Sequence, residues 1–483
     1  MQGGIMRAFV LSTVVAAVGL AAGCSDTPRT NEPIFATAGS GGGGIAGAAG
    51  AVVPASGGTG GTASGGTGGT ASGGIGGIAT GGQAGRGAAG AGGVIVGQGG
   101  AAGAPAVLAP PAPAGLVSLN SDYRTTSLSL LNTLGGAVTG DCVHSTSTSS
   151  GTALTISGDA VLPSQPQRGG DIVLVDRANG LLTFVDPAGC FVARQVPVPG
   201  GGKTNPHDVV IVSEHKAYVT RYDANTSSSQ QQAGNDVVVI DPVTGTFLSR
   251  IDMDAYAATG SGAGILARPD RALIADGRVV VSLNQVDATL TMYGSGAVLV
   301  IDPATDAVVT RVSLPGLFDC EGMDFMPGTH TLLVSCGGIY GDPNQPLQSG
   351  LAVVDFSGSS PRLDHVISSV AFDAHPLDFS WVLGAATPAA PHRAFAGTYR
   401  PDAAALDAVF EVDVTSGLVI RVGTAAPFSV GIPALAGDLL FVPEAIAGTP
   451  RIQLFDVGGA PQVVSGFTPD VTYNLPPRQI AWY

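Results

Sequence analysis

The sequence predicts an all-β fold for residues 116–483, a seven-bladed β-propeller built from four-stranded antiparallel blades. Two observations predict it. A strand–aspartate–turn–strand pattern recurs about every fifty residues, and no segment shows the period of a convincing amphipathic helix. A small sheet cannot bury both of its faces alone, whereas a ring of such sheets covers every face except the outermost strands.

Seven copies of the pattern align on a polar marker residue that ends an apolar strand and opens a turn. The markers are Asn132, Asp176, Asp241, Asp302, Asp355, Asp413 and Asp456. VVVIDPVTGTFLSRI (237–251) is a clear copy, and SLSLLNTLGGAVT (127–139) is a degenerate one. A second strand pair precedes the marker, as in DVVIVSEHKAYVTRY (208–222). We therefore expect four strands in each blade, with the marker in the last hairpin.

The two ends of the repeat region predict how the ring closes. The first repeat, from Leu116, lacks an inner strand of its own, whereas the chain ends in the proline-led strand PPRQIAWY (476–483) without following partners. We expect this last strand to complete the first blade and so to latch the ring.

The amino-terminal segment predicts export. Residues 1–23 contain one early positive charge, Arg7, then an apolar run from Ala8 to Leu20 that is too short to span a membrane. The ending Leu20-Ala21-Ala22-Gly23-Cys24 resembles a bacterial lipobox, which implies lipidation of Cys24. The alternative is an ordinary cleaved signal peptide with an incidental cysteine. We expect a lipoprotein of the outer membrane or the cell surface.

Residues 24–115 are predicted to form a tether between the lipid anchor and the folded domain. Gly, Ala, Ser and Thr dominate the segment from Ala38 to Gly103, which has almost no charge and few large apolar side chains. Such a composition buries too little surface to offset the entropy of ordering, so we expect a disordered coil. APPAPAG (109–115) then stiffens the approach to the folded domain.

The charge balance bears on the partners. The formal net charge is −15, and the only lysines are Lys203 and Lys216. A surface of this kind repels phosphate backbones, so we expect no nucleic-acid partner. We expect a monomer that contacts the membrane only through its lipid, and that binds a protein or a glycan of the envelope or the extracellular space.

Three segments of one repeat resemble the YVTN-type β-propeller repeat of bacterial and archaeal surface proteins. They are Asn205-Pro206-His207-Asp208, Ala217-Tyr218-Val219-Thr220 and Val239-Ile240-Asp241-Pro242-Val243-Thr244-Gly245. Arg221 replaces the asparagine that usually follows the threonine, and the other repeats match more loosely. The resemblance covers the whole repeat region at the level of the fold. It implies an exposed interaction module and brings no catalytic residues with it.

Four cysteines besides Cys24 predict two disulfides in an exported chain. Cys320 and Cys336 are each eight residues from Gly328 in one predicted hairpin, so they are expected to face each other on paired strands. Cys142 and Cys190 would then pair by elimination. The alternative is four reduced, buried thiols.

Polar residues gather where several predicted inner strands begin. We align Asp208, Asp324 and Asp378 around the axis, with His207, Glu321 and His375 nearby. Such a ring could bind an axial ligand, Ca²⁺ or another divalent metal in the central channel. The alternative is that each aspartate accepts backbone N–H bonds in the turn before its strand. No cofactor is otherwise indicated.

Two classes of function follow from the sequence. The chain contains neither G-x-S-x-G nor H-E-x-x-H, and no catalytic residue can be assigned. The first hypothesis is therefore a non-catalytic propeller displayed on the cell envelope for binding. The second is a metal-dependent, lactonase-like hydrolase with axial carboxylates.

Overall fold

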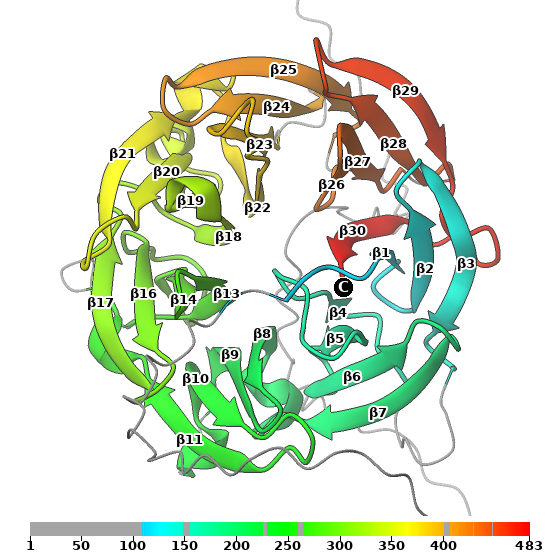
Figure 1. The fold of residues 1–483 in the computed structure, drawn as a ribbon. Helices are drawn as coiled ribbons and strands as arrows, with labels where there is room; N and C mark the ends of the chain where they lie inside the picture. The colour runs from blue at the N-terminus through cyan, green and yellow to red at the C-terminus, as the bar shows by residue number, and fades with distance from the viewer. Residues whose placement is uncertain are drawn as a thin grey trace, which may run out of the picture. The chain divides into compact units, whose positions relative to one another are not determined.

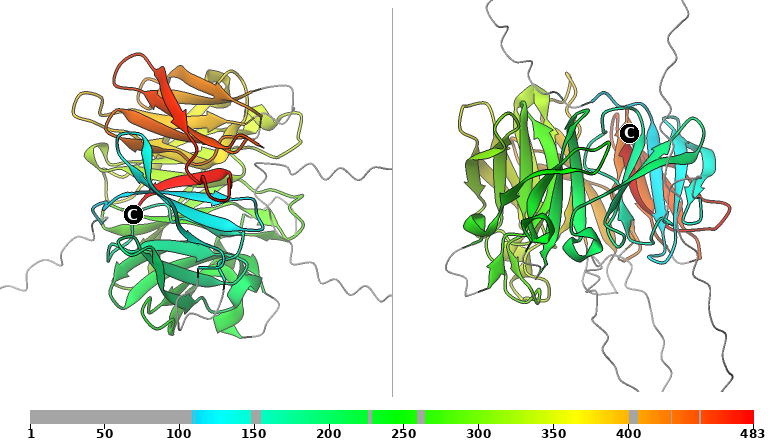
Figure 2. Two further views of the ribbon diagram at one scale, coloured as in Figure 1. Left: turned by 90° about the vertical axis from the view of Figure 1, so that its right-hand side faces the viewer. Right: turned by 90° about the horizontal axis from the view of Figure 1, so that it is seen from below.

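The computed structural model describes residues 109, 111–147, 155–225, 229–258, 264–399, 406–427, 429–446 and 448–483. They form seven four-stranded antiparallel sheets in a ring, and a further two-stranded sheet pairs β12 with β15 (Figures 1 and 2). The predicted seven-bladed propeller is thus confirmed. The predicted signal peptide, the predicted lipidation site Cys24 and most of the predicted tether lie outside the described residues.

The strands follow one another around the ring in chain order, four to a blade, and only β30 joins out of order. Blade 1 contains β1 (Leu116–Ser121), β2 (Thr126–Asn132), β3 (Gly136–His144) and β30 (Pro477–Trp482); blade 2 contains β4 (Ala160–Val161), β5 (Ile172–Asp176), β6 (Leu181–Asp186) and β7 (Phe191–Pro197); blade 3 contains β8 (Pro206–Ser213), β9 (Lys216–Ala224), β10 (Gly234–Ile240) and β11 (Phe247–Asp252); blade 4 contains β13 (Pro269–Ala275), β14 (Arg278–Leu283), β16 (Ala297–Asp302) and β17 (Ala307–Ser313). Blade 5 contains β18 (Cys320–Met326), β19 (Thr331–Cys336), β20 (Gly350–Asp355) and β21 (Arg362–Ser368); blade 6 contains β22 (Leu377–Gly384), β23 (Arg393–Thr398), β24 (Asp407–Asp413) and β25 (Leu418–Ala425); blade 7 contains β26 (Ala434–Ala436), β27 (Leu439–Glu444), β28 (Arg451–Asp456) and β29 (Gln462–Phe467).

The remaining elements are short and lie between or beside the blades. The extra sheet pairs β12 (Ile265–Leu266) with β15 (Val286–Asp287). The helical segments are 3-10 turns: η1 (Gly201–Thr204), η2 (Gln230–Gln232), η3 (Asp254–Tyr256), η4 (Pro327–Thr329), η5 (Gln345–Gln348) and η6 (Ser369–Ala371). Within the described part of the chain, no helix is long and apolar enough to cross a membrane.

The core is divided among the interfaces between blades. Seven clusters of buried apolar side chains are found in the described residues, one between each pair of neighbouring blades. The middle strands are buried on both faces, whereas outer strands such as β17 and β21 alternate between exposed and covered positions. Each blade therefore depends on both neighbours for its hydrophobic burial, which is why the fold needs a closed ring.

Each outer hairpin turns on an Asx motif, as the marker residues predict. Asp241 Oδ1, for example, accepts the backbone N–H groups of Val243 and Thr244, at 2.8 and 3.2 Å. In blade 2 the predicted marker, Asp176, lies one strand too early in the chain to open the outer hairpin. The equivalent turn belongs to Asp186, which ends β6, whereas Asp176 ends β5 and is fully buried. Both residues end an apolar strand before a turn, so the pattern alone does not separate them.

The carboxyl-terminal strand closes the ring as predicted. β30 pairs antiparallel with β1, with Leu116 opposite Trp482 and Ser118 opposite Ile480. It also contacts blade 7, because Ile480 N donates to Ile432 O at 2.8 Å. Figure 1 shows β30, at the red end of the chain, as the innermost strand of the cyan first blade.

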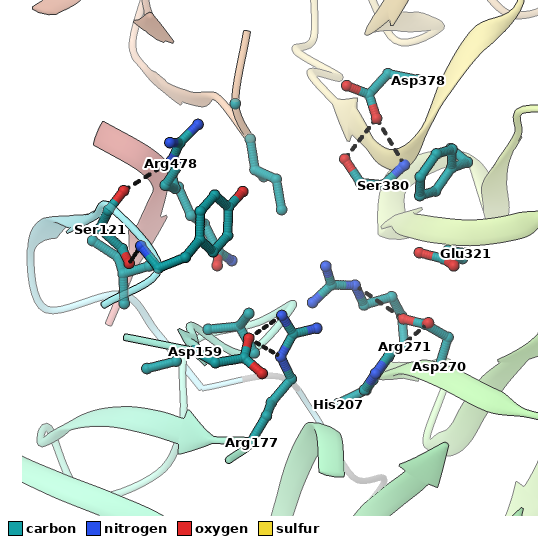
Figure 3. A pocket seen from close by; sticks show the side chains of 18 of the residues that line it. Ser121, Asp159, Arg177, His207, Asp270, Arg271, Glu321, Asp378, Ser380 and Arg478 are labelled. Atoms are coloured by element: carbon teal, nitrogen blue, oxygen red, sulfur yellow. Dashed lines mark hydrogen bonds and ion pairs between the residues drawn. The ribbon is translucent and has the colours of Figure 1, made fainter. Parts of the chain in front are cut away.

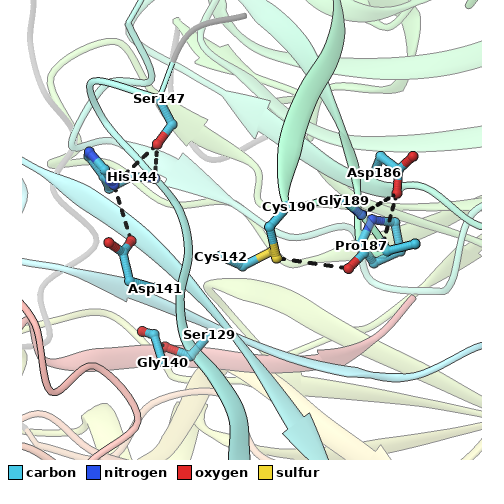
Figure 4. Close-up of a disulfide and its surroundings, with 11 residues drawn as sticks. Ser129, Gly140, Asp141, Cys142, His144, Ser147, Asp186, Pro187, Gly189 and Cys190 are labelled. Carbon is cyan, nitrogen blue, oxygen red and sulfur yellow. Dashed lines mark hydrogen bonds and ion pairs between the residues drawn. A yellow bond between two sulfur atoms is a disulfide. The ribbon is translucent and has the colours of Figure 1, made fainter.

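Two disulfides are present in the described residues, one between two blades and one within a blade. Cys142 on β3 is joined to Cys190, which precedes β7, so this bond connects blades 1 and 2 (Figure 4). Cys320 and Cys336 are bonded within blade 5, where they face each other across β18 and β19. Disulfides persist in oxidising compartments, so the pair of bonds indicates an exported protein.

Candidate binding site: a charged cavity on the propeller axis

Five inner strands present a charged or titratable residue at the same position. His207, Asp270, Glu321, Asp378 and Arg478 are each the second residue of an inner strand, on β8, β13, β18, β22 and β30. All five line one cavity of about 130 Å³. Because the inner strands surround the axis of a propeller, equivalent positions converge there. We call this space the charged cavity.

Three further charged side chains complete the lining of the charged cavity. Asp159 and Arg177 belong to blade 2, and Arg177 Nε donates to Asp159 Oδ1 at 2.8 Å. Arg271 follows Asp270 on β13, and its Nε lies 3.4 Å from Asp270 Oδ1. Figure 3 shows the carboxyl groups of Asp378 and Glu321 on one side of the cavity, with Arg177 on the opposite side.

The backbone just before three of these strands is left-handed. Asn205, Arg268 and Asp319 have φ angles of 47°, 47° and 54°. Asn and Asp adopt this conformation readily, but arginine does so at a cost. Arg268 is held in place by its Nη1, which lies 2.7 Å from Asp223 Oδ1, and by its guanidinium, which stacks over the Tyr222 ring at 4.6 Å. These turns fix the direction in which each inner strand enters the ring.

His207 and Asp270 form a buried pair at the wall of the charged cavity. His207 Nδ1 lies 2.8 Å from Asp270 Oδ2, and the imidazole stacks on Tyr222 with ring centroids 4.3 Å apart. Burial lowers the pKa of His207 below its ordinary value, so the ring is neutral at neutral pH. Nδ1 then carries the proton that Asp270 accepts, and Nε2 is left as an acceptor without a hydrogen-bond partner among the described residues.

Three neighbouring carboxyl groups are held away from their ordinary ionisation. Burial raises the pKa of Asp319 to about 7, and it raises the pKa of Glu321 and of Asp378. The charge of Asp270 adds to the rise at Asp319 and Glu321. Carboxyl groups with raised pKa values that gather in a cleft are candidates for a functional site.

The six residues proposed from the sequence as an axial ring do not form one set. His207, Glu321 and Asp378 line the charged cavity. Asp208 is fully buried between blades, where it accepts from Ser164 Oγ at 2.5 Å and from Ala272 N at 3.0 Å. The alternative interpretation also expected accepted backbone N–H bonds, but in the turn before its own strand, whereas Ala272 belongs to the neighbouring blade.

The two remaining members of that ring do not line the charged cavity. Asp324 lines a second cavity of the channel, and it accepts from Gly384 N at 2.8 Å and from Phe325 N at 2.7 Å. His375 precedes β22, is half-buried, and is not among the described residues that line the axial cavities. The alignment on Asp208, Asp324 and Asp378 was therefore wrong, because the inner strands carry bulges that shift their register.

A metal-binding set is not assembled by these side chains. Within the described ranges, no group of three or more His, Cys, Asp or Glu residues is arranged to hold a metal ion. Arg271 also lines this cavity, where its charge lowers the pKa of Glu321 and of Asp378. The residues present do not fit the divalent metal that the sequence suggested.

A second cavity continues the channel toward the other ends of the inner strands. It has a volume of about 300 Å³ and shares Arg271, Ser380, Ile432 and Gln479 with the charged cavity. Its walls include Trp381 and Trp482, together with Pro111 and Pro113 of the segment that precedes β1. The channel is therefore charged at one end and largely aromatic and proline-lined at the other.

From the sequence, the segment Arg268-Pro269-Asp270 was only a candidate fourth member of the axial ring, and Arg271, Arg478, Asp159 and Arg177 were not identified at all. A usable pattern was present in three strands. Pro206-His207, Pro269-Asp270 and Pro477-Arg478 place a proline directly before the cavity residue. An alignment on proline instead of aspartate would have found two of the missing members.

The comparisons with known proteins agree with the fold. No family model matches the chain, and no curated protein matches it. The structure of the periplasmic gluconolactonase PpgL from Pseudomonas aeruginosa aligns at 12% identity over 76% of this chain and 98% of that chain, with a TM-score of 0.50. A candidate 6-phosphogluconolactonase from Bacteroides uniformis aligns at 14% identity over 76% and 99%, with a TM-score of 0.47. At these identities the likeness shows the propeller fold alone.

Proposed function

We propose that the protein is an exported binding propeller that captures a small polar ligand in its charged cavity. The observation that carries the proposal is the convergence of His207, Asp270, Glu321, Asp378 and Arg478 from equivalent positions of five blades. Burying charges at an axis costs stability, and apolar side chains would fill the same space more favourably. A protein retains such a costly arrangement where a ligand uses it.

The setting of the domain forms part of the proposal. A lipid on Cys24 anchors the chain at the outer membrane or the cell surface, and residues 24–115 hold the propeller away from the bilayer. The likeness of residues 205–245 to the YVTN-type repeat supports a surface role. The ligand reaches the cavity as a free molecule or as the end of an envelope protein or glycan.

A ligand screen tests the proposal. Thermal melting of the full chain is measured with a panel of small neutral, anionic and cationic polar compounds. At least one compound should raise the melting temperature, because a ligand that binds only the native state stabilises it. The shift should vanish in Glu321→Gln and persist in Glu214→Gln, which removes an exposed carboxylate at the β8–β9 turn. Shifts that survive Glu321→Gln would place the binding site elsewhere.

Hydrolysis of a lactone or an ester is the second candidate, and the His207–Asp270 pair favours it. A neutral imidazole held by a carboxylate can take a proton from water as the water oxygen attacks the carbonyl carbon. The ring C–O bond then breaks, and the proton passes to the departing oxygen. Turnover of gluconolactone that His207→Gln abolishes would support this candidate, and turnover that is unchanged in His207→Gln would exclude it.

A further inference from the structure

The charges around the cavity do not balance. The lining contains four carboxyl groups and three guanidinium groups among the described residues. Asp159 is paired with Arg177, and Asp270 is paired with Arg271 and His207. The third guanidinium, that of Arg478, donates to Ser121 O at 2.9 Å. Glu321 and Asp378 have no ion-pair partner among the described residues. Both are turned toward the cavity on the side formed by blades 5 and 6 (Figure 3). The side of the cavity formed by blades 5 and 6 therefore carries an excess of negative charge whenever these carboxyl groups are ionised.

The hydrogen bonds of the lining also bear on the ligand. Glu321 Oε1 accepts from Asn284 Nδ2 at 2.5 Å, and Asp378 Oδ1 accepts from Ser380 N and Oγ at 2.9 and 2.6 Å. One buried acceptor of the lining, His207 Nε2, is left without a hydrogen-bond partner within the described structure. His207 is more than nine-tenths buried. A buried acceptor without a donor costs free energy, so a ligand that brings hydrogen-bond donors into the cavity is favoured.

We propose that the ligand of the charged cavity carries a primary ammonium group, which binds between Glu321 and Asp378. An ammonium group brings a positive charge and three N–H donors, with no acceptor of its own. It therefore supplies positive charge to the unpaired carboxyl groups and donors to the acceptors of the lining, and its hydrogen bonds to carboxylates are among the strong ones. The inference rests on the proposed binding function and names the ligand class for that site.

Calorimetric titration of the full chain at pH 8 tests the inference with three matched probes. Ethanolamine carries the ammonium group, ethylene glycol is its neutral analogue, and glycolate is an anion of similar size. Ethanolamine should bind at least tenfold more tightly than either of the others. Equal or tighter binding of ethylene glycol would overturn the ammonium assignment. If glycolate alone binds in the cavity, the proposed binding function stands and the ammonium inference falls.

Two conservative variants locate the bound group. Glu321→Gln and Asp378→Asn keep the shape of each side chain and remove its charge, and each should weaken ethanolamine binding by tenfold or more. Glu214→Gln and Asp364→Asn make the same changes at exposed positions and should leave the affinity unchanged. Melting curves show whether each variant is folded. If only one of the two cavity variants folds, that variant alone is sufficient for the test. Unchanged affinity in a folded cavity variant would contradict the proposal.

Discussion

Glu321 is only 4% exposed, and its ionisation costs stability because it is buried and, in addition, lies near the charges of Asp270 and Asp319. Its pKa is higher in the folded protein than in the unfolded chain. The protonated form is therefore favoured by folding, and stability is lost as the pH rises from the unfolded pKa near 4.3 through the folded pKa. The same direction holds for Asp319, whose pKa is raised to about 7.

Glu321→Gln should therefore stabilise the free protein more at pH 7.5 than at pH 4.5. Glutamine keeps the shape of the side chain but never ionises, so the pH-dependent loss at this residue disappears. The difference between the two pH values should be on the order of 1 kcal/mol or more, since one pKa unit corresponds to about 1.4 kcal/mol. Urea unfolding of variant and wild type at both pH values measures it. An equal effect at both pH values would show that Glu321 does not titrate in this range.

At this scale the sequence predicted the residue types better than their register. His207, Glu321 and Asp378 were identified, but they were aligned one or more positions out of step with each other. Asp208, which is buried, and Asp324, which is half-buried, accept backbone N–H groups instead. Bulges within the inner strands cause the mismatch, and a bulge leaves no simple trace in a single sequence.

The two disulfides support different elements, and their loss should have different consequences. The Cys142–Cys190 bond joins two blades across a separation of 48 residues, whereas the Cys320–Cys336 bond closes 16 residues within one blade. Loop-closure entropy then predicts a loss of about 4 kcal/mol for Cys142→Ala/Cys190→Ala and about 3 kcal/mol for Cys320→Ala/Cys336→Ala.

Cys320 of the second disulfide is the residue directly before Glu321 in the sequence. Cys320→Ala/Cys336→Ala should therefore weaken ligand binding as well, whereas Cys142→Ala/Cys190→Ala should not. Denaturant unfolding and ligand titration of both double variants separate the two effects. Equal ligand affinity in the two double variants would mean that the Cys320–Cys336 bond does not position Glu321.

At the scale of elements, blade 2 is the part that the sequence misplaced. Its inner strand β4 has only two residues. The sequence therefore shows no clear strand pair before β5, and the strands of this blade were counted one strand out of step. The segment that follows β4 is instead fixed by side chains, since Gln165 bonds Ile274 N at 2.8 Å and Gln479 Oε1 accepts from Leu162 N at 2.9 Å. Long-range contacts of this kind cannot be read from local periodicity.

Closure of the ring by β30 governs the stability of the whole molecule. Ile480 is 1% exposed and belongs to the apolar cluster between blades 7 and 1. Ile480→Ala should cost about 2–5 kcal/mol, because it removes buried methylene groups at the ring closure. Val463→Ala on the exposed face of β29 should cost less than about 0.5 kcal/mol.

Deletion of residues 476–483 should lower the melting temperature far more than either substitution, because it exposes the inner edge of β1. Thermal unfolding of the three variants checks this order. A deletion variant that melts like the wild type would show that blade 1 does not need its fourth strand. The sequence predicted this closure correctly, because a proline-led terminal strand without partners and a first repeat without an inner strand complement each other.

The central claim is that the charged cavity binds a ligand through its carboxyl groups, and a crystal structure of the protein with ethanolamine tests it most directly. We expect the ligand nitrogen to lie about 2.7–2.9 Å from carboxylate oxygens of both Glu321 and Asp378. Ethanolamine bound only outside the cavity, or a cavity that contains water alone at saturating ethanolamine, would contradict the account.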